Sequence, residues 1–208
     1  MTSTLAQLSK QSGEFEIIIV DGERADNTLS LVEEQVRMVS APGLSRGSRL
    51  NAGAAAAKGD IFLFLWPDSY LPANALTAIE RNLELLPQTI GGNFHVKFKE
   101  NTLFTRWLAK FLKLWRYRGR YYGNSGIFIR KEVFLALDGF RPYDLLEDYD
   151  LARRMERYGP TLYLPETIIA SGRKFQGRPL KAIFTWLIIH SLFTFGVHPN
   201  RLARWYRL

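Results

Sequence analysis

The sequence predicts an α/β protein with a doubly wound mixed sheet and helices on both faces. Up to Ile90, buried-strand patterns alternate with helical patterns at intervals of roughly 20 residues, which is typical of parallel strands joined by helices. The 208 residues, of which 47% are hydrophobic and 23% charged, suffice for one domain with its own core. No segment has the composition of a linker between two domains.

The first half of the chain supplies strands and helices in alternation. In a sheet of this kind, ligands bind beyond the carboxyl ends of the strands. Asp21 and Asp68 lie at the ends of two expected strands, which makes them candidate ligand-binding residues. The expected strands are 15–22, 36–42 and 61–65, and the expected helices are 4–10, 28–36, 45–60 and 73–86.

The second half mixes strands with longer helices. A helix over 145–159 has acidic residues in its first turn, where free N–H groups favour ionised carboxylates. The other elements expected here are a strand at 90–98, at an edge or in a mixed part of the sheet, a turn, strand and helix within 123–140, and a closing strand at 164–171.

Basic and aromatic residues are interleaved at 106–123 and at 201–208. This pattern, together with the net charge of +8, indicates an anionic partner such as nucleotide phosphates or acidic lipid. No helix-turn-helix or RNP-like motif points to specific nucleic-acid binding. A helix over 103–118 would carry Phe104, Trp107, Leu108, Phe111 and Trp115 on one face and Arg106, Lys110 and Lys113 on the other.

The helix expected at 179–197 is almost entirely apolar. Its stretch 182–197 has no Lys, Arg, Asp or Glu but is shorter than the roughly 20 residues that span a bilayer. We therefore expect a buried, interfacial or dimer-forming helix. The sequence has no Cys and its start has no signal-peptide pattern, which fits a cytoplasmic protein at the inner face of a membrane.

Four segments in order resemble the family-2 glycosyltransferases, which have the GT-A fold, and in particular a bacterial subgroup of small enzymes. They are "IIIVDGERADNT", "APGLSRGSRLNAGAAAAKGDIFLFLWPDSYLP", "YYGNSGIFIRKEVFLALDGF" and "LLEDYDLARRM", all within residues 16–155. The resemblance implies inverting transfer of a hexose from a nucleotide-sugar donor to an acceptor hydroxyl. It also implies a nucleotide-binding half at 1–90, an acceptor half at 91–175, and an apolar and basic helical segment at 176–208.

The resemblance also implies roles for individual residues. Asp68 would bind a divalent cation, Mn²⁺ or Mg²⁺, and one carboxylate can suffice because phosphates and water complete the shell of such ions. Asp148 would be the catalytic general base, with Glu147 as its paired acid. Adjacent helical residues point about 100° apart, so one of these acids can face the acceptor while the other contacts protein. The residues expected near the nucleotide sugar are Asp21, Asp26, Arg46, Arg49, Asn51, Gly53 and Arg173.

Two departures from the family pattern leave alternatives open. The sequence starts after the strand and Pro-x-x-Asn-Glu loop with which relatives begin, so we expect the sheet to lack that first strand. Trp66 also stands where many relatives carry a second metal-binding acid. The alternative function is a catalytically degraded family-2 fold that docks on a membrane or a partner, and a homodimer is a further alternative.

Overall fold

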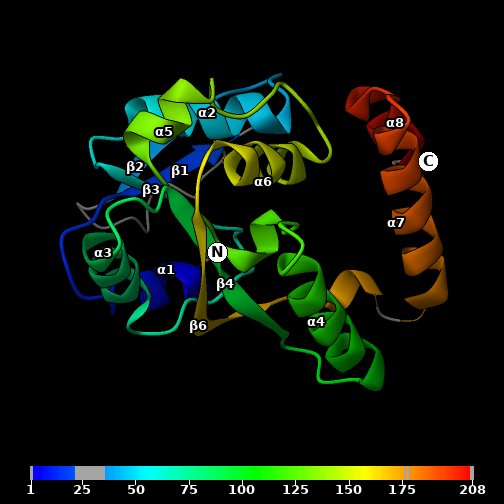
Figure 1. The fold of residues 1–208 in the computed structure, drawn as a ribbon, viewed down its shortest axis with the longest axis horizontal. Helices are drawn as coiled ribbons and strands as arrows, with labels where there is room; N and C mark the ends of the chain where they lie inside the picture. Colours follow the sequence, from blue (N-terminus) through cyan, green and yellow to red (C-terminus); the bar gives the residue numbers. More distant parts are fainter. Residues whose placement is uncertain (1, 22–35, 176, 178, 207–208) are drawn as a thin grey trace.

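The computed structural model describes residues 2–21, 36–175, 177 and 179–206, and Figure 1 shows their arrangement. The candidate residue Asp26 lies outside these residues. The predicted helix at 28–36 also lies outside them, apart from Val36. The elements of the first half are α1 (Thr2–Leu8), β1 (Ile17–Asp21), β2 (Val36–Ser40), α2 (Arg46–Ala56), β3 (Ile61–Phe64) and α3 (Ala75–Leu85).

The second half has the strands and helices that its sequence predicts, with boundaries that differ by a few residues. Two short 3-10 turns, η2 and η3, join them. The elements are β4 (Gly91–Phe98), α4 (Leu103–Arg116), η2 (Gly123–Ser125), β5 (Ile127–Arg130), α5 (Lys131–Ala136), α6 (Glu147–Tyr158), β6 (Thr161–Ala170), η3 (Arg173–Phe175), α7 (Pro179–Thr194) and α8 (Pro199–Tyr206).

The described strands form two sheets. β1 and β2 pair in parallel, as the spacing predicts, while β3, β5, β4 and β6 form a mixed sheet in that order. β3 pairs antiparallel with β5, and no described strand joins β3 to β1.

The alternative that β4 lies at an edge is wrong, because β4 pairs with both β5 and β6. Two glycines allow this central position. A Cβ at Gly91 would overlap the backbone of β5 at Phe128, and a Cβ at Gly92 would overlap the backbone of β6 at Leu162. Only glycine lets both neighbouring strands come this close.

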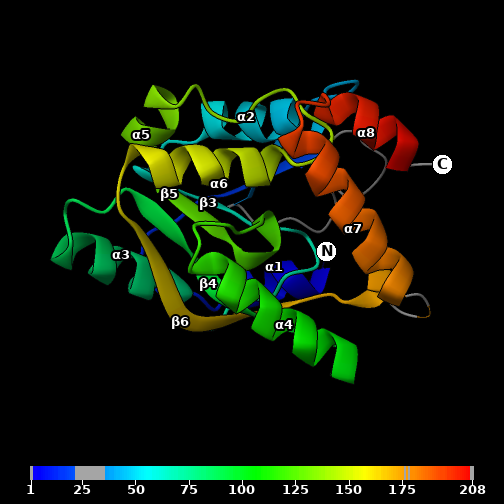
Figure 2. The same cartoon turned by 45° about the vertical axis from the view of Figure 1, so that its right-hand side comes forward.

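Helices cover both faces of the mixed sheet, as predicted (Figures 1 and 2). The alternation along β5 divides the core, because Ile127 and Ile129 pack on one face and Phe128 on the other. The first face is covered by α2, α5 and α6, and the second by α1 and α3. This two-sided core fixes the ends of α2, β3 and α6, where the candidate site lies.

Candidate active site

Arg46 begins α2 and directs its side chain toward the start of α6. Ser45 caps the helix by accepting a hydrogen bond from the Ser48 N–H at 3.2 Å. The Arg46 N–H donates to Asp144 Oδ1 at 3.2 Å, which ties the helix start to the loop before α6. Gly47 permits this approach, since a Cβ there would overlap the carbonyl group of Arg141.

A buried contact between Arg46 and Glu147 joins these two elements. Arg46 Nε lies 2.9 Å from Glu147 Oε1, and the Glu147 side chain is only 1% exposed. The contact has no aligned hydrogen bond, and Glu147 Oε2 and Arg46 Nη2 are also buried without a hydrogen-bond partner among the described residues. The Arg46 guanidinium stacks on Trp66, with Cζ 3.3 Å from the ring centroid.

Burial raises the pKa of Glu147 to about 8, and the neighbouring Asp148 carboxylate acts in the same direction. The Arg46 guanidinium opposes the shift without cancelling it. Glu147 therefore holds a proton at neutral pH, which leaves the positive charge of Arg46 only partly compensated.

Asp148 faces the loop before β5 and is half-buried. Its Oδ2 accepts the Gly123 N–H at 2.7 Å, and its Oδ1 accepts the Tyr149 N–H at 2.7 Å. Glycine is required at position 123, because a Cβ there would overlap Trp66 Nε1 and crowd Asp148 Oδ2. Trp66, Gly123 and Asp148 are thus in direct contact.

The backbone just before this acidic pair adopts an unusual conformation. Leu146, the N-cap of α6, has φ 63° and ψ 15°, in the left-handed region that leucine rarely occupies. Such a residue costs on the order of 1–3 kcal/mol, and residues of this kind cluster at functional sites. Here the turn sets the direction in which Glu147 and Asp148 leave the first turn of α6.

Helix α7 supports the site from behind through an aromatic cluster. Tyr122 stacks on Tyr149 at a centroid distance of 5.4 Å, and its hydroxyl lies 2.9 Å from His190 Nε2. His190 Nδ1 lies 2.9 Å from the Trp186 carbonyl, which can only accept, so Nδ1 carries the proton and Tyr122 donates to Nε2. Burial lowers the pKa of His190 and raises that of Tyr122, so both rings stay neutral at pH 7.

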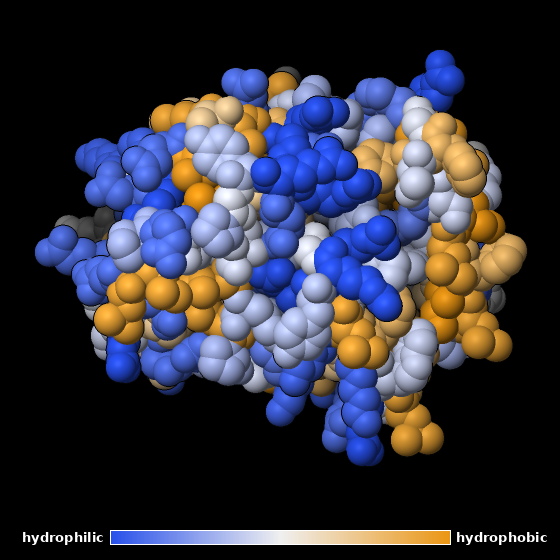
Figure 3. All heavy atoms as spheres, in the orientation of Figure 1, coloured by the Kyte–Doolittle hydropathy of each residue, from blue (hydrophilic) through white to orange (hydrophobic). Residues whose placement is uncertain are grey.

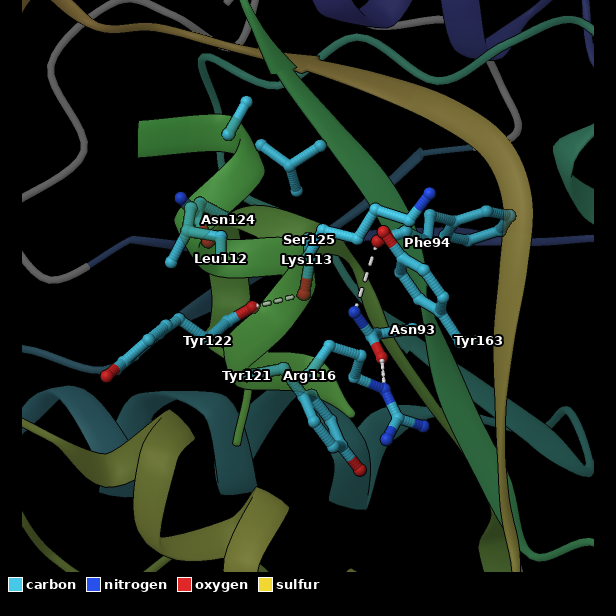
Figure 4. A pocket seen from close by; sticks show the side chains of 12 residues that line it. Asn93, Phe94, Leu112, Lys113, Arg116, Tyr121, Tyr122, Asn124, Ser125 and Tyr163 are labelled. Atoms are coloured by element: carbon cyan, nitrogen blue, oxygen red, sulfur yellow. Dashed lines mark hydrogen bonds between the residues drawn. The ribbon is translucent and has the colours of Figure 1, made fainter. Parts of the chain in front are cut away.

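A small cavity lies beside the Gly123 turn, between β4 and α4 (Figure 4). Its volume of about 20 Å³ holds roughly one water molecule and is far too small for a sugar nucleotide. Arg116 fills its base, with Nε donating to Asn93 Oδ1 at 2.5 Å and Nη2 to the Leu162 carbonyl at 3.0 Å. This cavity belongs to the support of the turn and not to a donor pocket.

The remaining candidate residues are more scattered. Asp21 ends β1, and Asp68 lies exposed in the turn two residues after Trp66. Arg49 is half-buried on α2, and Arg173 is exposed in η3, where its Nε donates to Ser171 Oγ at 3.3 Å. The structure thus brings Arg46, Glu147 and Asp148 together around Trp66.

Asn51, expected near the donor, has its amide engaged with the backbone. Its Oδ1 accepts the Phe140 N–H and its Nδ2 donates to the Phe140 carbonyl, both at 2.8 Å. Gly53 packs against β1, since a Cβ there would overlap the side chain of Val20. These two residues position α2 against its neighbours.

The described residues contain no group of three acidic or histidine side chains that could hold a metal ion by themselves. A lone exposed carboxylate at Asp68 fits a cation that is held mainly by phosphate oxygens. None of the described helices is long and apolar enough to cross a membrane.

Sequence reasoning missed four participants of this site. Gly123 and Tyr122 lie in the segment "YYGNSG", whose paired glycines indicate a tight turn but not its contact with Asp148. Trp66 is evident only as a departure from a pattern. The left-handed Leu146 has no sequence signal, because leucine is ordinarily excluded from that conformation.

Comparison with known proteins gives one family match. The model of the family described as "Glycosyl transferase family 2" matches residues 1–138, more than half of the chain. No match was found among curated protein sequences.

Solved structures share the fold. S. aureus TarS superposes with a TM-score of 0.65 at 16% identity, over 97% of this chain and 38% of that one. Its 1–349 fragment in complex with UDP-GlcNAc gives 0.58 at 16% identity, over 82% and 52%. The mannosyltransferase PcManGT from Pyrobaculum calidifontis, in complex with GDP-Man and Mn²⁺, gives 0.66 at 17% identity, over 92% and 57%.

These likenesses confirm the predicted GT-A-like fold. The identities are too low to carry ligands or residue roles from one protein to another. The chain also spans less than two thirds of the length of each of these structures.

Proposed function

Since the protein is a member of glycosyl transferase family 2, we propose that it transfers a sugar from a nucleotide-sugar donor to an acceptor hydroxyl with inversion at the anomeric carbon. The observation that carries this proposal is the Asp148 carboxylate, fixed by the Gly123 and Tyr149 N–H groups and half-open to an acceptor. A family-2 fold that only docks on a partner would have no need of an acidic side chain held in this way.

In the proposed mechanism Asp148 accepts the proton of the acceptor hydroxyl as that oxygen attacks the anomeric carbon. The attacking oxygen forms the new glycosidic bond, the bond to the nucleoside diphosphate breaks on the opposite face, and the configuration therefore inverts. Glu147, protonated at neutral pH, does not compete for the proton.

The donor diphosphate gains negative charge as it leaves. The Arg46 guanidinium, on a side chain that is 27% exposed, is a suitable donor to one of its oxygens, and Trp66 holds the guanidinium plane in place. We propose Asp21, Asp26, Arg49 and Arg173 as further contacts to the nucleotide sugar. Asn51 we assign to the positioning of α2, because both of its bonds go to Phe140.

We propose that a divalent cation, Mn²⁺ or Mg²⁺, is held jointly by Asp68 and the donor diphosphate. When bound, such an ion stabilises the charge that develops on the leaving group. With one protein carboxylate, the free protein should hold the ion only weakly. We also propose that the protein acts peripherally at the inner face of a membrane.

The general-base assignment is tested with Asp148→Asn. Transfer with a panel of nucleotide sugars and soluble alcohols should fall by roughly 10²–10⁴-fold, the usual contribution of a general base. Donor affinity by calorimetry should stay the same, since the variant keeps the shape of the side chain. Asp60→Asn, an exposed aspartate before β3, is the control. Equal turnover of Asp148→Asn and the wild type would refute the assignment.

The cation assignment is tested by measuring donor affinity with and without Mn²⁺. The affinity of the wild type for the donor should rise by about tenfold or more with Mn²⁺, which corresponds to at least about 1.4 kcal/mol of binding free energy. Asp68→Ala should not show this rise. Asp60→Ala should keep the full gain. A Mn²⁺ effect unchanged in Asp68→Ala would remove this residue from the metal site, and a panel in which no nucleotide sugar binds would favour the docking function instead.

A further inference from the structure

We infer that α4 and α7 together form a docking surface for a lipid bilayer with anionic headgroups. This inference gives a surface and a lipid chemistry to the membrane contact proposed above, and it does not depend on sugar transfer. The exposed apolar residues of this docking surface are Leu103, Trp107 and Leu114 of α4 and Leu180, Phe184 and Leu187 of α7.

The six residues fall on two exposed stripes. Leu103, Trp107 and Leu114 recur at the helical intervals i, i+4 and i+11, and Leu180, Phe184 and Leu187 recur at i, i+4 and i+7, so each set shares one face of its helix. Leu103 is 83% exposed, Leu180 79% and Phe184 65%. Single exposed apolar residues are ordinary, but two adjoining stripes of them indicate an interaction site.

Aromatic packing joins α4 to α7. Along α4, Trp107 stacks on Phe111 at 5.5 Å and Phe111 on Trp115 at 5.2 Å. From α7, Trp186 packs edge-on against Phe111 and Trp115, at 5.7 Å from each. The two stripes therefore belong to one rigid unit. Figure 3 shows apolar atoms along the edge of the molecule where α7 and α8 lie, with hydrophilic side chains projecting below, beside α4.

Charge selects the partner. The segments 101–131 and 167–208 contain no Asp or Glu, and the exposed Arg106, Lys110 and Lys113 flank the apolar stripe of α4. Basic side chains beside aromatic residues are the pattern of a helix that lies in the headgroup region, where each Lys or Arg adds to the attraction to anionic lipid. A second copy of the chain would instead bring two acid-free faces together.

The dimensions indicate a protein that lies on the membrane. Helix α7 has 16 residues and a length of about 24 Å, shorter than the roughly 30 Å hydrocarbon core. It is apolar nearly all round, yet Ile189 is the only one of its residues that is fully buried. A helix of this composition ordinarily lies in a protein core or in lipid, and the face of α7 that carries Leu180, Phe184 and Leu187 is exposed.

The test is flotation of the full chain with vesicles of phosphatidylcholine alone or mixed with phosphatidylglycerol. The wild type should float with the mixed vesicles, far less with the neutral ones, and less again at high salt. Phe184→Ser with Leu187→Ser should lower the partition coefficient by about tenfold or more per residue. Lys110→Glu with Lys113→Glu should abolish the preference for anionic vesicles.

Matched controls carry the same changes elsewhere. Leu85→Ser, at a residue of α3 that is 66% exposed, and Lys10→Glu with Arg81→Glu should bind vesicles as the wild type does. Flotation lost equally in controls and targets would overturn the inference. The inference would also be overturned if the wild type did not float at all, or if it bound an RNA oligonucleotide but no vesicles. It would likewise be overturned by a dimer in sedimentation equilibrium that Phe184→Ser with Leu187→Ser dissociates. Transfer to a soluble alcohol, assayed without vesicles, reports separately on the proposed function.

Discussion

Glu147 is a carboxyl group that the fold removes from water and gives one cationic neighbour. Because the folded protein raises its pKa from 4.5 to about 8, the folded state binds a proton that the unfolded state releases over this range. The free energy of unfolding must then fall as pH rises between these two values. Asp148, one residue away, contributes to this shift because two negative charges would lie side by side.

Glu147→Gln should remove this pH dependence. The amide keeps the size of the side chain and cannot lose a proton, so its free energy of unfolding should fall less between pH 4.5 and about 8 than that of the wild type. Urea denaturation at several pH values measures the difference, with the exposed Glu80→Gln as the control. Identical slopes for wild type and Glu147→Gln would mean that Glu147 titrates normally in the folded protein.

At the level of residues, the paired acids of "LLEDYD" were assigned from the family resemblance, and their roles stay predictions. The structure places Glu147 beside Arg46 and Asp148 against Gly123, so the two acids do lie at one site with the Arg46–Trp66 contact. Asn51 shows the limit of this reasoning. Its side-chain amide makes both of its hydrogen bonds with the backbone of Phe140, a residue distant in the sequence. No local sequence pattern predicts such a contact.

At the level of elements, α4 is stabilised at its start by a capping box. Thr102 Oγ1 accepts the Thr105 N–H at 3.1 Å, and Thr105 Oγ1 accepts the Thr102 N–H at 3.0 Å. The reciprocal bonds satisfy two backbone donors that a helix start otherwise leaves open. Because Leu103 and Trp107 follow directly, this cap also orders the first turns of the docking surface.

Thr102→Ala should lower the free energy of unfolding by about 1 kcal/mol, the usual worth of an N-cap. The matched control is Asn74→Ala at the N-cap of α3, where the side chain makes no capping hydrogen bond and the loss should be close to zero. Chemical denaturation of the two variants and the wild type gives both values. An equal loss at the two positions would show that the box at Thr102 contributes nothing beyond ordinary helix propensity.

The helices were the most predictable elements, since capping residues and period signal their extent locally. The strands were predictable in place but not in partner. The residues of β4 predict a strand at an edge or in a mixed part of the sheet. Its position between β5 and β6 depends on the close approach of the neighbouring backbones that Gly91 and Gly92 permit. Pairing depends on residues far along the chain, which a local pattern does not contain.

At the scale of the whole molecule, two core layers hold the site rigidly. The layer formed by α2, α5 and α6 includes Phe62, Ile127 and Leu151, and it fixes the ends from which Arg46, Trp66 and Asp148 project. The sequence predicts this layering through the alternation of apolar residues along each strand. It does not predict the unjoined β1 and β3, because hydrogen bonding between strands depends on every strand that is present.

The two acid-free segments also make the charge distribution of the protein asymmetric, because all its carboxylate side chains lie in the remaining parts of the chain. A protein with such a charge distribution experiences a torque in the electric field above an anionic membrane. The protein should therefore be oriented before it contacts the membrane, within about 10 Å of the surface at 0.1 M salt, the range over which the field is not yet screened. Arrival in one preferred attitude would then be a property of the free protein in solution, fixed ahead of any insertion of side chains.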